Sequence, residues 1–103
     1  MLVHIVFWRL YARASGGTKD DHALELKRRF ESLVGVVPGL LRCEVGIDEG
    51  RTPESSDLAL YSEFESKQAL DAYASHPAHS DIVTFLEGRR SERRVVDYQI
   101  ARS

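Results

Sequence analysis

The sequence is short of cysteine, of long hydrophobic runs and of any excess of one charge, and each shortage excludes a class of protein. Cys43 is the only cysteine, so an internal disulfide and a cysteine-ligated metal cluster are excluded, which fits a reducing, cytoplasmic environment. The longest apolar runs are about five to six residues, against the roughly 20 that a membrane-spanning helix needs. The formal net charge is −2, and Lys and Arg are scattered. We expect no membrane insertion, no nucleic-acid partner and, from the first residues, no signal peptide.

What remains is the composition of an ordinary globular domain. The chain has 103 residues, of which 43% are hydrophobic and 29% charged. This length fits one domain over residues 1–103, with a core of about 2–100, and leaves no room for a second. A domain this small buries a modest fraction of its surface, so a partner subunit would add materially to its stability.

The first predicted strand, residues 2–10, is apolar on both faces. One face carries Leu2, His4, Val6 and Trp8, and the other carries Val3, Ile5 and Phe7. A strand with one solvated face normally alternates apolar and polar residues. Because a small domain has helices for one face only, the other face predicts a second subunit.

The remaining pattern predicts the order β-α-β-β-α-β of a ferredoxin-like α+β fold with a four-stranded antiparallel sheet. Apolar residues at helical spacing predict a helix over about 19–36, which Pro38-Gly39 ends. Strands are predicted at about 40–46, 58–64 and 94–100, with a polar loop at 47–56. Between the last two strands, a short helix capped by Ser66 is followed by a helix that begins near Pro77.

Several stretches of the chain resemble the stress-responsive A/B-barrel (Dabb) family. They are Val3-His4-Ile5-Val6-Phe7, Val37-Pro38-Gly39, the run from Phe64 through Tyr73 to His76-Pro77-Ala78-His79, and Val95-Val96-Asp97-Tyr98. The resemblance covers nearly the whole chain, and a tyrosine followed by HPAH is its most specific part. It implies a homodimer in which two ferredoxin-like sheets face each other and form a dimeric α/β barrel.

The resemblance also implies a catalytic set. A family member of known activity performs a cofactor-free aldol cyclisation of a polyketide with a histidine and a tyrosine, which fall on His79 and Tyr73. Asp97 takes the position of the aspartate that partners the catalytic histidine, and His4 that of the first-strand histidine. The implied ligand is a small carbonyl compound, and no cofactor or metal is implied.

The ligand pocket is expected between sheet and helices. Its predicted lining is Val6, Trp8, Leu26, Phe30, Leu60 and Val95. Trp8 and Phe30 are bulky, which favours an alternative in which the polar residues form a buried network in a non-catalytic binding or stress-protective dimer. A third, weaker reading is a cofactor-free monooxygenase, because such enzymes resemble this fold and size. Fold alone does not decide between these functions.

The other histidines and the arginines receive simpler interpretations. His76 precedes Pro77 and is interpreted as a helix-boundary residue, and His22 as a surface residue in an exposed helix turn. His76 and His79 are three residues apart, which is less typical of a metal pair than a spacing of four. The run of arginines at 89–94 is interpreted as a solvated rim that could steer an acidic ligand.

Overall fold

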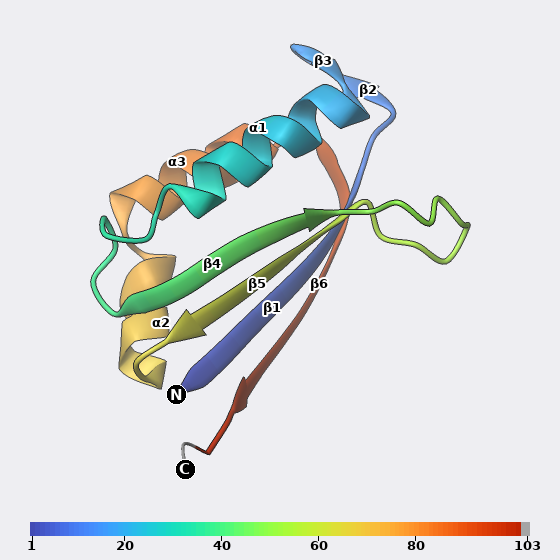
Figure 1. Cartoon of the computed structure of the whole chain (residues 1–103). Helices are drawn as coiled ribbons and strands as arrows, with labels where there is room; N and C mark the ends of the chain where they lie inside the picture. The colour runs from blue at the N-terminus through green and yellow to red at the C-terminus, as the bar shows by residue number, and fades with distance from the viewer. Residues whose placement is uncertain (102–103) are drawn as a thin grey trace.

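Four antiparallel strands form the main sheet of the computed structural model, which describes residues 1–101 (Figure 1). The strand order is β4-β5-β1-β6, so the first and third strands of the α+β pattern lie in the middle and the second and fourth lie at the edges. The strands are β1 (Leu2–Leu10), β4 (Leu40–Ile47), β5 (Leu58–Phe64) and β6 (Arg90–Gln99). A two-stranded hairpin of β2 (Arg13–Ala14) and β3 (Gly17–Thr18) precedes the first helix. The predicted ferredoxin-like α+β fold is confirmed.

The first helix, α1 (Lys19–Glu31), begins at a complete capping box and is shorter than predicted. Thr18 accepts a hydrogen bond from the Asp21 backbone N–H, and the Asp21 carboxylate accepts one from the Thr18 backbone N–H. We predicted that this helix would extend to residue 36, but it ends at Glu31. Ser32 is the C-cap, and the chain then turns through residues 33–37, where Gly35 has a φ of +88° and Leu33 and Val37 stay buried.

The other two helices, α2 (Lys67–Ala74) and α3 (Pro77–Leu86), begin where the sequence indicates. The Ser66 side chain caps α2 by accepting from the Ala69 N–H. His76 caps α3, because its ring Nδ1 accepts from the Ala78 N–H. Pro77 occupies the first turn of α3, where its missing N–H costs nothing. The break between α2 and α3 places Tyr73 and His79 on consecutive helices.

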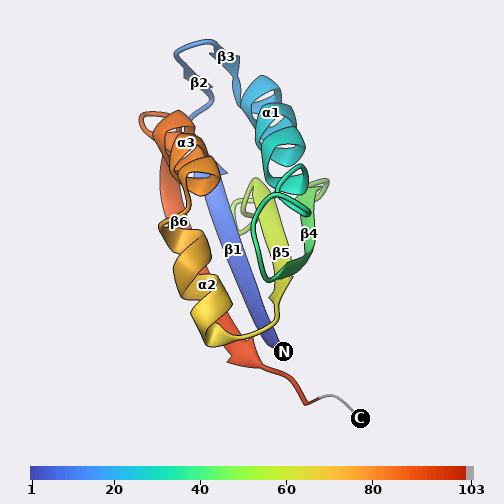
Figure 2. The same cartoon turned by 90° about the vertical axis from the view of Figure 1, so that its left-hand side faces the viewer.

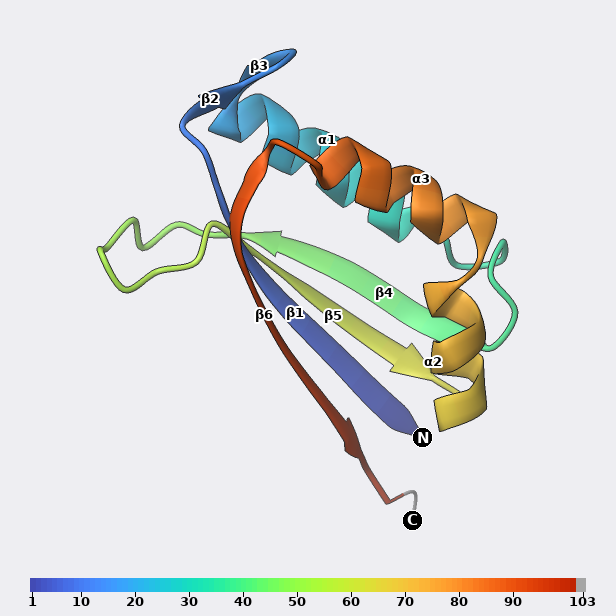
Figure 3. The ribbon, with the colours of Figure 1, turned by 180° about the vertical axis from the view of Figure 1, so that it is seen from behind.

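All three helices cover the same face of the sheet (Figures 2 and 3). On β1 this face is formed by alternate residues, all of them buried: Leu2, His4, Val6, Trp8 and Leu10. They pack against the apolar side of α1, where Leu26 and Phe30 are fully buried. Helix α1 is also tied to the edge strand β4, because Lys27 donates to the Val45 carbonyl and Glu31 accepts from the Val45 N–H. These contacts occupy the backbone N–H and C=O groups of Val45 on an edge strand, where they would otherwise be free to pair with another strand.

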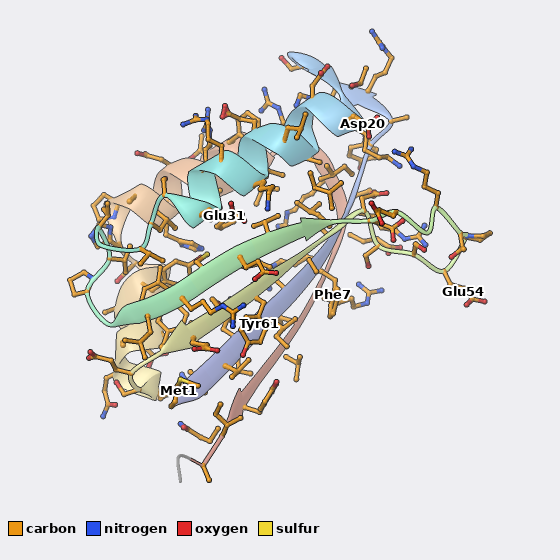
Figure 4. All side chains as sticks on the ribbon, in the orientation of Figure 1. Met1, Phe7, Asp20, Glu31, Glu54 and Tyr61 are labelled. Carbon is orange, nitrogen blue, oxygen red and sulfur yellow. The ribbon has the colours of Figure 1, made fainter. Side chains whose placement is uncertain are left out.

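In the described part of the chain, no helix lies on the opposite face of the sheet. Phe7 on β1 is 39% exposed, and Val96 and Tyr98 on β6 are 47% and 42% exposed. Figure 4 draws Phe7 and Tyr61 on this side, away from the helices. We call this surface the open face, and define it by Ile5, Phe7, Tyr61, Val96 and Tyr98.

Two further expectations require correction. The last strand was predicted at 94–100, but β6 begins at Arg90, because residues 90–93 continue the ladder alongside the end of β1. His22 was interpreted as a surface residue, but it is buried. The ring of Phe85 on α3 meets its ring edge to face at 5.8 Å, and Gly16 in the turn of the small hairpin lies beside it.

Candidate functional site

His4 and Asp97 lie directly opposite each other on the two neighbouring strands β1 and β6. Their Cα atoms are partners in the antiparallel register, so both side chains point to the helix-covered face. The His4 Nδ1 and Asp97 Oδ1 atoms are 2.5 Å apart. His4 is buried, whereas the Asp97 side chain is 37% exposed. Because an ionised carboxylate only accepts hydrogen bonds, this contact places the proton of a neutral His4 ring on Nδ1.

This pair corrects the expected hydrogen bond between Asp97 and His79. Within residues 1–101, the hydrogen-bonding partner of the Asp97 carboxylate is His4, and His79 bonds to the backbone carbonyl of Ala74 instead. The reason is the sheet register, which brings Asp97 against His4 as its cross-strand neighbour. His79 lies in the first turn of α3, above the sheet.

Tyr73, on α2, joins the two histidines. Its ring centroid lies 4.3 Å from that of His79 and 6.2 Å from that of His4, and it also contacts the Phe64 ring at 5.0 Å. The side chain is buried, and burial raises the pKa of its hydroxyl well above the usual 10.0. Tyr73 therefore stays protonated at neutral pH and is suited to donate a hydrogen bond.

His79 is held as a neutral base. Its Nδ1 lies 3.2 Å from the Ala74 carbonyl oxygen. A carbonyl oxygen only accepts, so Nδ1 carries the proton and Nε2 keeps its lone pair. Burial lowers the pKa of His79 below the usual 6.5, against the opposing effect of the hydrogen bond to Ala74, and the positive charge of Arg93 acts in the same direction as burial. The imidazole is therefore uncharged at neutral pH.

A small cavity of about 70 Å³ opens beside these residues on the helix side of the sheet. Its lining comes from β1, β5, β6 and all three helices, and consists of Trp8, Phe30, Leu60, Tyr73, His79, Val83, Leu86, Arg90 and Arg93. The rings of Trp8 and Phe30 stack with centroids 5.3 Å apart and fill much of the space that a larger ligand would need. Ligand sites for drug-sized molecules usually measure about 300–1,000 Å³.

Of the residues predicted to line the ligand pocket, the structure places Trp8, Phe30 and Leu60 at this cavity and the other three elsewhere. Val6 and Leu26 pack in the core beneath the cavity, and Val95 is 47% exposed further along β6. Sequence reasoning placed Arg90 and Arg93 on a solvated rim and not at the cavity, because the last strand was predicted to begin after them. The alternation of Arg93, Val95 and Asp97 along one strand was the signal that could have placed Arg93 on this face.

Two larger hollows lie elsewhere on the surface. One, of about 270 Å³, lies between the start of α1 and the 48–57 loop, and its charges face each other as Lys19–Asp57 and Arg51–Asp20 pairs. The other, of about 510 Å³, is a shallow depression of the open face beside Phe7 and Ala59. Within residues 1–101, no three His, Cys, Asp or Glu side chains are grouped as metal ligands. No helix in that range is long and apolar enough to cross a membrane.

Comparison with known proteins finds a matching family and a similar plant protein. The model of the stress responsive A/B barrel domain (Dabb) matches residues 2–100. The stress-response A/B barrel domain-containing protein HS1 of Arabidopsis thaliana is 27% identical over 92 residues, which is 87% of this chain and 84% of that protein.

Solved structures share the fold. A dimeric ferredoxin-like protein of unknown function from Bacteroides fragilis is 28% identical, with a TM-score of 0.83 over 96% of this chain and 95% of that one. The hydroxynitrile lyase of Passiflora edulis is 18% identical, with a TM-score of 0.79 over 99% and 94% of the two chains. At that identity the likeness concerns the fold alone.

Proposed function

Because the chain belongs to the stress-responsive A/B-barrel (Dabb) family, we propose that it is a homodimer that binds a small carbonyl compound and acts on it by cofactor-independent acid–base chemistry of the lyase or cyclase type. The observation that carries this proposal is the arrangement of His79. Its Nδ1 is bonded to a backbone carbonyl, its ring lies against Tyr73, and both side chains line one cavity. A neutral histidine beside a protonated tyrosine can supply the base and the hydrogen-bond donor of an enolisation.

The proposed step is the removal of a proton next to a carbonyl group. Nε2 of His79 takes the proton from the carbon, and the electron pair of the broken C–H bond moves to the carbonyl oxygen. The Tyr73 hydroxyl donates a hydrogen bond to the enolate oxygen that forms. The enolate can then attack a second carbonyl, expel a leaving group or take a proton back.

His4 and Asp97 act through Tyr73 in this proposal, as positioning residues. The His4 ring meets the edge of both Tyr73 and Phe64, each with centroids 6.2 Å away, and Asp97 fixes the orientation of the His4 ring. The orienting role that a carboxylate plays in histidine dyads therefore falls on His4 and not on the proposed base.

The open face supports the homodimer. Phe7, Val96 and Tyr98 are each between 39% and 47% exposed, and together with Ile5 and Tyr61 they form an apolar sheet surface without a helix to cover it. Contiguous apolar surfaces of this kind mark interaction sites. The relative from Bacteroides fragilis is a dimer, which agrees with a second copy as the cover.

A second candidate function is a non-catalytic binding or stress-protective dimer. The size of the cavity favours it, because about 70 Å³ is well below the usual volume of a small-molecule site. In that case Tyr73, His79 and the His4–Asp97 pair form a polar network that stabilises the packing of α2 and α3 on the sheet.

Hydrogen–deuterium exchange distinguishes the two functions without knowledge of the natural substrate. The protein is incubated in D₂O with a panel of small ketones and oxo acids, and loss of the proton signal next to the carbonyl is followed by NMR. We expect catalysed exchange with at least one compound, and a fall of about 10²–10⁴-fold in its rate in His79→Gln. Tyr73→Phe should slow the same exchange, because the enolate loses its donor.

His76→Asn is the matched control. It removes a histidine three residues from His79 but leaves a side chain that can cap α3, so the exchange rate should not change. If no compound in the panel exchanges faster than in buffer, or if His79→Gln exchanges at the full rate, the catalytic proposal fails. A lower melting temperature of His79→Gln with no exchange in either protein would favour the non-catalytic dimer.

A further inference from the structure

Two arginines at the cavity wall have no carboxylate partner, whereas several arginines elsewhere do. Arg90 and Arg93, both on β6, line the same cavity as His79. Within residues 1–101 neither guanidinium takes part in an ion pair, whereas Arg28, for example, is bound to Glu25 at 2.6 Å. A cationic wall without anionic partners favours a negatively charged ligand.

Trp8, which lines the same cavity, carries an unpaired hydrogen-bond donor. Its ring is 3% exposed, and in the described part of the chain its Nε1–H has no acceptor. A buried donor without a partner costs free energy, and a ligand oxygen that reaches it would recover that cost. Trp8 and Arg93 are direct partners in the register of β1 and β6, so the two side chains are neighbours on the helix-covered face.

We propose that the cavity takes a short-chain organic acid whose carboxylate binds Arg93, with Arg90 adding positive charge and the indole N–H of Trp8 offering a further hydrogen bond. This inference rests on the proposed function, since it names the class of carbonyl compound. A guanidinium presents parallel N–H donors that match the two oxygens of a carboxylate. With the carboxylate at Arg93, the carbonyl of an oxo acid extends toward Tyr73 and His79.

The cavity limits the length of the acid. Its volume of about 70 Å³ is enough for only a few heavy atoms, since one water occupies roughly 30 Å³ in the liquid. Its inner wall is apolar, with Phe30, Leu60 and Leu86. A chain of about three or four carbons, with its charged end at the arginines, satisfies both conditions.

The charge of the ligand also acts on the base. The positive charge of Arg93 contributes to the lowered pKa of His79. A bound carboxylate offsets that charge, so the pKa of His79 rises toward its usual 6.5 and the imidazole becomes more basic when the ligand is present.

The indole resonance of Trp8 tests the proposal directly, because the chain has one tryptophan and therefore one indole N–H signal. The ¹⁵N-labelled protein is titrated with pyruvate, and in parallel with uncharged methyl pyruvate and with inorganic phosphate. We expect a saturable shift of the Trp8 indole signal with pyruvate and a much weaker response to the other two probes. Arg93→Gln should weaken pyruvate binding by about 10- to 100-fold.

Arg28→Gln is the control, since it makes the same change of charge on the exposed side of α1 and should bind pyruvate as the unaltered protein does. Equal binding of methyl pyruvate or of phosphate overturns the assignment to a carboxylate. So does an unchanged affinity in Arg93→Gln, or the absence of any pyruvate response. The proposed function and the ligand class can fail separately. If pyruvate binds but is not exchanged, the acid–base chemistry is contradicted and the ligand class stands. If only neutral ketones are exchanged, the chemistry stands and the carboxylate ligand is contradicted.

Discussion

The two faces of β1 carry similarly apolar side chains but have different surroundings. On one face Val6, Trp8 and Leu10 are buried under helices of the same chain. On the other face Phe7 is 39% exposed, and no helix or strand among residues 1–101 covers it. An apolar strand face therefore indicates that the face packs against something. The number of helices in the chain decides whether it packs against the same subunit or against a second one.

The largest effect is expected on the helix-covered face. Phe30→Ala removes a fully buried ring that stacks on Trp8, and should lower the free energy of unfolding by about 3–5 kcal/mol. Urea denaturation measures this loss, which should be equal at low and high protein concentration if it arises within one subunit. A loss that disappears at high concentration would mean that Phe30 stabilises an interface.

The next effect concerns the open face. Ile5→Asp places a charge where we expect the second subunit, and should dissociate the dimer, since each large buried side chain contributes about 1.5–3 kcal/mol. Analytical ultracentrifugation follows the dissociation. Leu24→Asp makes a comparable change on α1, where the leucine is 61% exposed, and should leave the assembly intact. A monomeric unaltered protein at micromolar concentration, or a dimeric Ile5→Asp, contradicts the assignment of the interface.

A smaller effect is expected from pH, through His79. Burial lowers the pKa of His79 in the folded protein below the usual 6.5, so the unfolded chain takes up this proton at a higher pH than the folded protein. The contribution of His79 to stability is therefore complete above pH 6.5 and is lost as the pH falls through the lower folded-state pKa. The slope for one group is at most about 1.4 kcal/mol per pH unit.

Thermal unfolding between pH 7.5 and 5 checks this dependence. His79→Gln cannot take up the proton, so its melting temperature should fall less steeply over the acidic part of this range. Identical slopes in the two proteins would show that His79 is not perturbed by burial.

Much of the fold followed from the sequence because local signals agreed with each other. The two apolar faces of residues 2–10, the Thr18 start of α1 and the Pro77 start of α3 each have a physical cause within a few residues. The predicted end of α1 was wrong because apolar residues continue at helical spacing beyond it, and the turn through Gly35 keeps Leu33 and Val37 buried although the helix has ended.

The site was less predictable because it depends on register and on contacts between distant elements. The family resemblance assigned Asp97 to His79, whereas the β1–β6 register pairs Asp97 with His4. No local pattern reports the alignment of the first and last strands. The burial of His22 escaped prediction for the same reason, since Phe85 covers it from another helix.

The tautomer of His79 tests the central claim most directly. Long-range ¹H–¹⁵N NMR at pH 7.5 distinguishes the two ring nitrogens of each histidine. If His79 is the base, its Nδ1 carries the proton and bonds to the Ala74 carbonyl, its Nε2 is unprotonated, and the ring titrates below pH 6.5. A proton on Nε2 at pH 7.5, or titration above pH 6.5 in the ligand-free protein, would contradict the account.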